Sequence, residues 1–521
     1  MDSKQETGKI STEESRNQTG NQPDESSGGP VSLMKWIGFA GGLLLFVVMI
    51  LASPPEGLGL AGWRTAAVAA LMATWWVTEV IPISATAMLP LVLFPVLGIA
   101  DISATATPYA NPMIFLFLGG FIIAIAMQRW DLHRRIALNI IVLIGSKPRN
   151  IIAGFMVSSA FMSMWVSNTA ATLMMLPIAM SVIQLTRSGN DLKLSHREFR
   201  NFSLTLMLAI AFSSSVGGLG TVIGTPTNAL MIAFVHDAYG IEINFAEWMM
   251  IGIPVVILGL PVIFYALANI VYPVRFQKLP GGKEFIVGEL SRLGKISRPE
   301  IMVAVVFTFT GMMWMTRPLF ADLIPGLSDA GIAIFGALLL FLIPVNLKNA
   351  TFLLQWKDAE KLPWGVLILF GGGLSLAGAI QRTGLAEWVG GYFGIIGGWH
   401  VILIIFVVSI VIIMFTELAS NSATAAAFLP VIGSVAISIG QDPLLLAIPV
   451  ALVASCAFML PVATPPNAIV YGSGVMSIPE MAKAGLLLNL FFAILISILT
   501  YFLFTLIMGI EIGTIPAAMS P

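Results

Sequence analysis

The chain has 521 residues, of which 57% are hydrophobic and only 10% are charged, with a formal net charge of −1 at pH 7. Soluble domains carry about 25% charged residues, so this composition excludes a soluble globular protein and favours a chain that lies largely within a membrane. The single cysteine excludes a disulfide framework and any cysteine-based metal cluster.

The first 32 residues differ in composition from the rest of the chain. Residues 1–32 are polar and rich in Ser, Gln, Asn, Glu and Gly. Such a segment cannot bury a core, so it is predicted to be a disordered tail that function does not need. It is too long and too mixed in charge to be the n-region of a signal peptide.

Long apolar runs follow the tail, and crossing a bilayer core takes about 20 residues. They predict eleven spans, two of them unusually long: 34–53, 62–80, 82–99, 108–128, 203–237, 246–272, 299–316, 329–346, 364–381, 443–475 and 481–508. With the N-terminus inside, nineteen Lys and Arg residues beyond the tail fall on the cytoplasmic side, and only Arg64, Arg317 and Arg382 fall outside. This distribution follows the positive-inside rule and predicts an external C-terminus.

The segment 150–186 must enter the membrane and return, because Arg149 and Arg187 both lie on the cytoplasmic side. Each arm of 17 residues reaches roughly 26 Å at helical rise, so length alone does not separate a re-entrant hairpin from two short spans. Its tip is Ser167-Asn168-Thr169, three polar residues whose burial in hydrocarbon is costly unless they find partners. The preceding stretch 130–140 is typical of a basic amphipathic helix at the inner surface.

The hairpin recurs in the second half of the chain. SNTAATLMMLP (167–177) returns as SNSATAAAFLP (420–430), an offset of 253 that also aligns Gly119-Gly120 with Gly372-Gly373 and Gln128-Arg129 with Gln381-Arg382. GTPTNAL (224–230) returns as ATPPNAI (463–469) at an offset of 239, and the basic loop 187–200 accounts for the difference. An odd number of spans separates the copies, so the second hairpin, 398–440, enters from the opposite face. Inverted repeats of this kind are typical of secondary transporters, whose sites lie near the midplane.

Both long spans contain residues that interrupt helices. The first holds Gly217, Gly218, Gly220, Gly224 and Pro226, and the second holds Pro461, Pro465 and Pro466. Each span is expected to unwind there and to expose carbonyl groups. Carbonyls suit Na⁺ and helix N-termini suit a carboxylate, so a tip and a break used twice predict two cation sites flanking one anion site.

More ordinary interpretations exist for each piece. Ser and Thr in spans often bond back to their own helix or join two helices, and a lone TP or PPN is more often a kink than a site. Glu417, three residues before the second tip, is expected to bond backbone near the hairpin, with proton coupling as the alternative. No phosphate loop, metal-ligand cluster or nucleophile triad occurs, so an enzyme is not expected.

The twin SNT-type tips and twin TPxN breaks, with TEVIPISATAMLP and NPMIFLFLGGFIIAIAMQRWDLHRRIA, resemble the divalent anion–sodium symporter (DASS) family over roughly residues 33–515. The resemblance implies a homodimeric carrier that takes up C4-dicarboxylates (succinate, fumarate, malate) with Na⁺, at two or more sodium sites. It also implies an elevator motion of a hairpin-bearing transport domain against a scaffold. Sulfate symport and dicarboxylate exchange are the alternatives within this fold.

The resemblance also implies a set of site residues. A first sodium site takes Ser163, Ser167, Asn168 and Gly224, and a second takes Thr416, Ala419, Asn421 and Ala463. The substrate is expected to contact Ser167, Asn168, Thr169, Thr225, Pro226, Ser420, Asn421, Ser422, Thr464 and Pro465. Ser422 departs from the SNT or SNV of many relatives; it keeps a hydroxyl but lacks a methyl group, which bears on substrate selectivity.

The expected fold is an all-α integral protein of the inner membrane, with about eleven transmembrane helices, two opposed re-entrant hairpins and an inverted repeat. The expected organisation is a tail 1–32, scaffold helices 33–100, a first transport region 101–245, scaffold helices and cytoplasmic loop 246–350 (loop 273–298), a second transport region 351–480, and a last helix 481–515. A sodium/proton or arsenite-type exchanger of similar architecture and, less readily, a channel are the other classes considered. No Lys or Arg lies near either tip, so bound Na⁺ is expected to neutralise the dianion.

Overall fold

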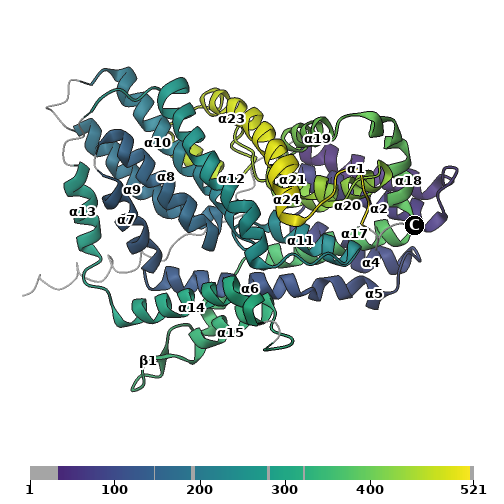
Figure 1. Cartoon of the computed structure of the whole chain (residues 1–521), viewed down its shortest axis with the longest axis horizontal. Coiled ribbons are helices and arrows are strands. Elements are labelled where there is room, and N and C mark those ends of the chain that lie inside the picture. Colours follow the sequence, from purple (N-terminus) through teal and green to yellow (C-terminus); the bar gives the residue numbers. More distant parts are fainter. Residues whose placement is uncertain (1–32, 146, 189–193, 278–281, 321–322, 517–521) are drawn as a thin grey trace, which may run out of the picture.

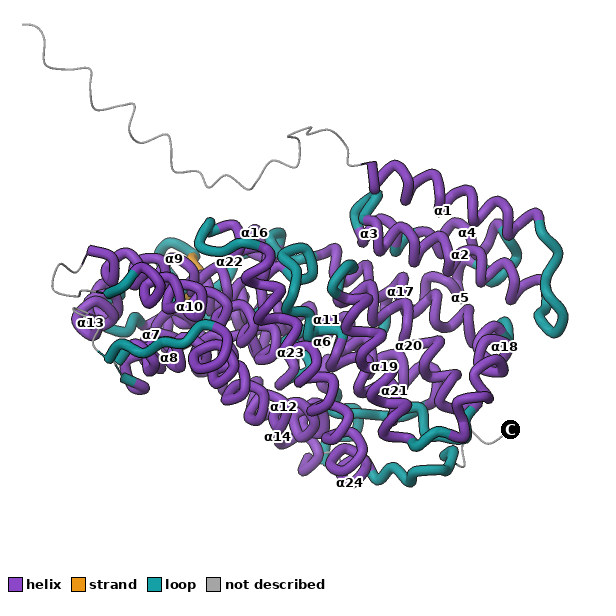
Figure 2. The backbone as a smooth tube through the Cα atoms, turned by 90° about the horizontal axis from the view of Figure 1, so that it is seen from above, coloured by secondary structure: helices purple, strands orange, loops and turns teal. Residues whose placement is uncertain are grey.

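The computed structural model describes residues 33–145, 147–188, 194–277, 282–320 and 323–516. The predicted tail 1–32 lies outside these residues. Helices make up most of the described chain, and the two hairpins lie towards opposite ends of its long axis (Figure 1). The view from above shows α1–α4 grouped at one end and α7–α10 at the other (Figure 2).

The first half of the chain runs from α1 to η3. Its helices are α1 (Leu33–Leu51), α2 (Leu60–Thr78), α3 (Ile83–Thr86), α4 (Leu89–Val96), α5 (Ile102–Ala106), η1 (Thr107–Ala110), α6 (Pro112–Arg129), α7 (Leu132–Ile144), α8 (Pro148–Trp165), α9 (Asn168–Ser188), α10 (His196–Gly217), η2 (Gly218–Gly220), α11 (Pro226–Tyr239), α12 (Phe245–Tyr265) and η3 (Ala266–Val271). The predicted hairpin 150–186 is the pair α8 and α9, and the amphipathic stretch 130–140 lies in α7.

The second half begins with α13 (Gly282–Arg292), within the loop that was predicted between spans. The elements that follow are α14 (Arg298–Phe320), α15 (Asp329–Leu342), β1 (Pro344–Asn346), β2 (Thr351–Phe352), α16 (Trp356–Ala359), α17 (Trp364–Arg382), α18 (Leu385–Gly391), η4 (Tyr392–Gly398), α19 (Val401–Thr416), α20 (Asn421–Ser438), α21 (Leu444–Val453), α22 (Pro465–Gly472), α23 (Ile478–Leu499), η5 (Thr500–Phe504) and α24 (Thr505–Met508). The strands β1 and β2 form a small antiparallel pair in which Pro344 lies opposite Phe352.

Eight helices within the described residues are long and apolar enough to cross a membrane, and several shorter apolar helices accompany them. Some predicted spans differ in detail: 82–99 is divided into α3 and α4 rather than being continuous, and 329–346 is helical only to Leu342, after which β1 begins. Pro90 stands in the first turn of α4, where the missing amide costs least, so a new helix starts there readily.

The packing follows the repeat. In the first hairpin α8 packs against α10, and in the second α19 packs against α21. The return arms cross between halves: α9 packs against α22, and α20 packs against α11. The glycines aligned by the 253-residue offset are both tightly packed, because a methyl group on Gly119 would collide with Ala333 and one on Gly372 with Ala87. The inverted repeat is therefore also a pattern of contacts.

Candidate functional site

The first hairpin tip lies between α8 and α9, where Val166 and Ser167 are the only residues outside the two helices. Ser163 donates a hydrogen bond from Oγ to Asn168 Oδ1 at 2.5 Å. Ser167 Oγ accepts from the amide of Ala170 at 3.2 Å and so caps the first turn of α9. Three of the predicted polar residues are thus held at the point where one helix ends and the next begins.

The second tip repeats the central contact of the first. Thr416, the last residue of α19, donates from Oγ1 to Asn421 Oδ1 at 2.8 Å, and its hydroxyl also lies 2.8 Å from the carbonyl oxygen of Ala454. Thr416 and Asn421 are five residues apart, as are Ser163 and Asn168, and the two pairs are related by the offset of 253. The structure therefore brings together the hydroxyl and amide predicted for each tip.

The two breaks are held by the asparagines of the TPxN motifs. Asn228 donates from Nδ2 to the carbonyl oxygens of Gly218 at 3.0 Å and Thr221 at 2.7 Å. Asn467 donates to the carbonyl oxygens of Ala457 and Leu460, both at 3.0 Å. In each case the acceptors lie ten and seven residues earlier in the chain. One amide therefore bridges each unwound segment and fixes the direction of its carbonyl groups.

A glycine on the following helix lets each break pack closely. A methyl group on Gly252 of α12 would collide with the carbonyl oxygen of Leu219, and one on Gly485 of α23 would collide with the backbone of Phe458. Leu219 and Phe458 are equivalent under the 239-residue offset. Close backbone approach is the reason for glycine at both positions.

The hydrogen bonds between each break and its neighbouring segments differ. At the first, Thr221 donates to the carbonyl oxygen of Met164, and the indole of Trp248 donates to that of Leu219 at 3.1 Å. The chain from Gly218 to Gly220 keeps a helical turn and needs few external acceptors.

At the second break, the carboxylate of Glu417 accepts from the amides of Phe458 at 2.8 Å, Met459 at 2.9 Å and Leu460 at 3.0 Å. Asn489 of α23 adds a fourth bond at 2.7 Å. Glu417 is 4% exposed, and a buried carboxylate requires such partners. The structure therefore confirms the prediction that Glu417 bonds to backbone near the second hairpin.

The two breaks also meet. Ser455, just after α21, lies with its Oγ 2.9 Å from Thr227 Oγ1 and 3.3 Å from Thr225 Oγ1 at the start of α11. Thr464 is equivalent to Thr225 under the 239-residue offset. It instead caps α22, where its Oγ1 accepts a hydrogen bond from the amide of Asn467 at 3.3 Å. The first TP turn thus contacts the start of the second break, whereas the hydroxyl of Thr464 bonds within its own turn.

Several predicted oxygens converge around Gly218. A methyl group there would collide with Asn168 Oδ1 and would lie 3.0 Å from the carbonyl oxygen of Gly224. Asn168, Gly224 and Ser163 were all predicted for the first sodium site, so three of its four members are close neighbours. In the second half Thr416 and Asn421 are joined, but no hydrogen bond within the described residues links Ala419 or Ala463 to them.

The remaining predicted substrate contacts have unused hydrogen-bonding capacity. Within the described residues, the half-buried hydroxyls of Thr169, Ser420 and Ser422 make no hydrogen bond to protein. Pro226 and Pro465 begin α11 and α22, so the N-terminal ends of those helices lie at the breaks. Such hydroxyls and the N-terminal amides of helices can donate hydrogen bonds to an anion and are therefore suited to binding one.

Fixed charge is scarce at this site. The ion pairs formed by the described residues include Arg129–Asp358, Arg135–Glu300, Arg200–Glu480 and Arg317–Asp329, and none has a member at a tip or break. The described residues contain no group of three or more His, Cys, Asp or Glu side chains that could hold a metal ion. Neutral oxygens and amides dominate the site, with Glu417 saturated by its own donors.

Sequence reasoning missed several residues that shape the site. The asparagines Asn228 and Asn467 were visible as the matched N of TPxN, a signal that could have given them a role. Ser455, Asn489, Gly252 and Gly485 carried no local signal, because their function comes from contact with distant segments.

Comparison with known proteins identifies a family whose model matches most of the chain. The model of the sodium:sulfate symporter transmembrane region matches residues 33–510. Sodium-dependent dicarboxylate transporter SdcS of Staphylococcus saprophyticus is 42% identical over 483 residues, covering 91% of this chain and 92% of the relative. SdcS of Staphylococcus aureus (strain USA300) is also 42% identical, covering 93% and 94%.

Two solved structures share the fold at low identity. The YdaH transporter of Alcanivorax borkumensis aligns with a TM-score of 0.53 and 12% identity, over 90% of this chain and 97% of that one. MtrF of Neisseria gonorrhoeae, described within a class of antimetabolite efflux pumps, aligns with a TM-score of 0.55 and 13% identity, over 90% and 93%.

Proposed function

The chain belongs to the sodium:sulfate symporter family of transmembrane proteins, and on that premise we propose that it imports C4-dicarboxylates together with sodium. Relatives that are 42% identical over nine-tenths of the chain carry the name sodium-dependent dicarboxylate transporter. Succinate, fumarate and malate are the proposed substrates. The protein is a transporter and not an enzyme.

The observation that carries the proposal is the paired hydroxyl–asparagine contact at the two hairpin tips. Each tip presents a hydroxyl oxygen and an amide oxygen within 2.8 Å of one another, beside an unwound helix whose carbonyls are fixed by a second asparagine. Neutral oxygens of this kind suit Na⁺, and the free hydroxyls and helix ends next to them suit a carboxylate.

The proposed sodium sites follow from this geometry. We assign a first site to Ser163, Ser167, Asn168 and Gly224, and a second to Thr416, Ala419, Asn421 and Ala463. The dianion lies between them, against Thr169, Ser420 and Ser422 and the turns Thr225-Pro226 and Thr464-Pro465. Because no Lys or Arg among the described residues lies at the tips, the bound cations supply the positive charge that the substrate needs. Substrate affinity therefore depends on sodium.

The remaining parts of the proposal concern movement and assembly. The hairpins and broken helices, in 101–245 and 351–480, form a transport domain that moves as an elevator against the scaffold helices. The working unit is a homodimer in the inner membrane, with the N-terminus in the cytoplasm and the C-terminus outside. The distribution of Lys and Arg supports this orientation.

Sulfate is the second candidate substrate, because the family description names it. It is also a dianion that neutral hydroxyls and helix ends can hold. It is more compact than a C4-dicarboxylate, which carries two separate carboxylates. Competition between unlabelled sulfate and labelled succinate separates the two substrates.

Uptake of labelled succinate into proteoliposomes tests the proposal. We expect uptake driven by an inward Na⁺ gradient and lost in Asn168→Ala and Asn421→Ala. Asn349→Ala, an exposed asparagine between β1 and β2, is the matched control and should transport normally. Sulfate uptake without succinate uptake would contradict the proposed substrate. Sodium-independent exchange of succinate for another dicarboxylate would contradict the proposed coupling to sodium.

A further inference from the structure

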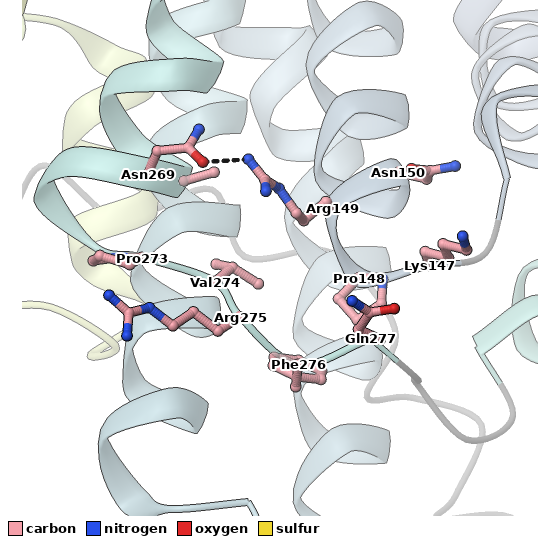
Figure 3. Close-up of a pocket in the computed structure, with 11 residues that line it drawn as sticks. Lys147, Pro148, Arg149, Asn150, Asn269, Pro273, Val274, Arg275, Phe276 and Gln277 are labelled. Atoms are coloured by element: carbon pink, nitrogen blue, oxygen red, sulfur yellow. Dashed lines mark hydrogen bonds between the residues drawn. The ribbon is translucent and has the colours of Figure 1, made fainter.

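A cavity of ≈500 Å³ lies far from the tips, between the first turn of α8 and the end of the α12–η3 helix (Figure 3). Its lining includes Lys147 and Arg149 at the start of α8, Asn269 in η3, and Arg275 and Gln277 in the segment that follows. None of these residues belongs to the proposed transport site, so the cavity has no assigned role.

Among the described residues, the charged side chains that line the cavity are all basic. Three cationic side chains line it and no Asp or Glu does. Within the described residues, Lys147, Arg149 and Arg275 form no ion pair. The positive charge of the cavity is thus left largely uncompensated.

The side chains are arranged around the rim. Arg149 donates to Asn269 Oδ1 at 2.5 Å across the gap between α8 and η3, and its guanidinium lies 5.5 Å from the ring of Phe264. Arg275 and Lys147 extend away to either side of this bridge (Figure 3). Arg149 is held in place before any ligand binds, which reduces the side-chain conformational entropy that is lost on binding.

The wall of the cavity is built from ordered backbone. The amide of Val274 donates to the carbonyl oxygen of Ala268 at 3.0 Å, which folds the segment back over η3. Asn201 of α10 donates to the carbonyl oxygen of Pro273 at 3.1 Å, and Thr205 donates to that of Tyr272 at 3.1 Å. Arg275 therefore projects from a segment that is fixed to α10.

The surroundings indicate a lipid. The cavity lies at the ends of apolar helices, and its sequence neighbours expose large hydrophobic side chains: Ile270 is 57% exposed and Leu143 is 87% exposed. A charged hollow next to exposed apolar side chains matches a phospholipid, with its phosphate in the hollow and its acyl chains against the helices. Basic pockets between membrane helices are suited to anionic head groups.

We propose that this cavity, between Arg149 and Arg275, binds the phosphate group of an acidic phospholipid. Arg149 belongs to the hairpin arm α8, whereas Arg275 and Asn269 follow α12. A bound head group therefore ties the base of the first hairpin to the neighbouring helix. The inference shares no residue with the substrate site and does not depend on which substrate is carried.

Lipid binding to the purified, delipidated full-length protein tests it. Native mass spectrometry or thermal unfolding is used to titrate phosphatidylglycerol, with phosphatidylcholine and inorganic phosphate as separate arms. The double variant Arg149→Gln/Arg275→Gln removes both cations. Lys348→Gln/Lys357→Gln removes two exposed charges elsewhere in the described chain and is the matched control.

We expect phosphatidylglycerol to bind the wild type and the control equally, and phosphatidylcholine to bind far more weakly. The double variant should bind phosphatidylglycerol about thirtyfold more weakly, since each basic residue near a charged lipid contributes about fivefold. If that variant does not fold, Lys147→Gln should still weaken binding several-fold. Equal binding by the variant and the wild type overturns the proposal. Binding of inorganic phosphate alone, without phosphatidylglycerol, overturns the assignment to a lipid.

Discussion

The two helix breaks solve the same problem with different chemistry. Both are bridged by an asparagine that bonds to carbonyls ten and seven residues earlier, and both pack against a glycine of the next helix. The first break keeps a short helical turn and uses neutral donors, whereas the second relies on the carboxylate of Glu417. The position equivalent to Glu417 in the first half is Met164.

The difference shows which features the repeat retains. The elements closest to the proposed ligands, the hydroxyl–asparagine pair and the bridging asparagine, recur in both halves. The groups that support the unwound backbone from behind differ, because unpaired amides can be satisfied by any acceptor within reach. The longer second break, from Ala454 to Thr464, leaves more amides without helical partners and therefore needs a multidentate acceptor.

The largest expected effect is at this acceptor. Glu417→Gln keeps the oxygen that accepts from Phe458 and Met459, but it places an NH2 group opposite the buried amide of Leu460, and an unsatisfied buried group costs about 1–3 kcal/mol. The remaining bonds also change from charge-assisted to neutral, so we expect a stability loss of about 3 kcal/mol and a severe loss of uptake. Cys456, the chain's single cysteine, is fully buried within the second break, so maleimide labelling of its thiol should become faster.

Met164→Leu, at the equivalent position of the first half, is the control for Glu417→Gln. A volume-conserving apolar change costs under about 1.5 kcal/mol, so labelling of Cys456 and uptake should remain near wild type. Equal effects of the two substitutions would contradict the claim that the second break depends on the side chain at this position and the first does not.

The bridging asparagines should matter equally. Asn228→Ala and Asn467→Ala each remove two hydrogen bonds to buried carbonyls, at a cost of about 1–3 kcal/mol. We expect both to lower the maximal rate of sodium-driven uptake at least tenfold, while surface expression is retained. A near-normal rate for one of them, beside a severe loss for the other, would show that the two bridges are not equivalent.

The hydroxyl partners of the tip asparagines should give a smaller effect. Ser163→Ala and Thr416→Ala each remove one donor to an amide oxygen, worth about 1 kcal/mol or roughly fivefold in an equilibrium. The sodium concentration for half-maximal uptake should rise by about that factor in each variant. Ser181→Ala, an exposed serine that bonds only within α9, serves as the control. An unchanged sodium dependence in both variants would exclude these hydroxyls from the cation sites.

Much of this arrangement could be predicted from the sequence, because it rests on local patterns. Apolar runs gave the spans, and the matched SNT-type and TPxN motifs gave the tips and breaks at the residues where helices end. The paired Ser163–Asn168 and Thr416–Asn421 contacts follow from five-residue spacing at a helix junction. Ser455, Asn489 and the backing glycines could not be predicted, because their contacts join segments that are distant in the chain.

The smallest effect is expected at Ser422, the residue where the second tip departs from the first. Ser422→Thr restores the methyl group of Thr169 and keeps the hydroxyl, so the succinate KM should change by no more than about fourfold, as expected for one methylene-sized contact worth about 0.8 kcal/mol. The relative uptake of fumarate and malate measures any change in selectivity. A change in KM beyond tenfold would mean that the two tips hold the substrate in different ways.

The central claim is that sodium assembles both tips and thereby creates the substrate site. Binding of labelled succinate to the purified protein, measured in NaCl and in KCl of equal ionic strength, tests it most directly. The proposal predicts saturable binding in NaCl and none in KCl, because the described tips hold no fixed positive charge. Equal affinity in the two salts would contradict it.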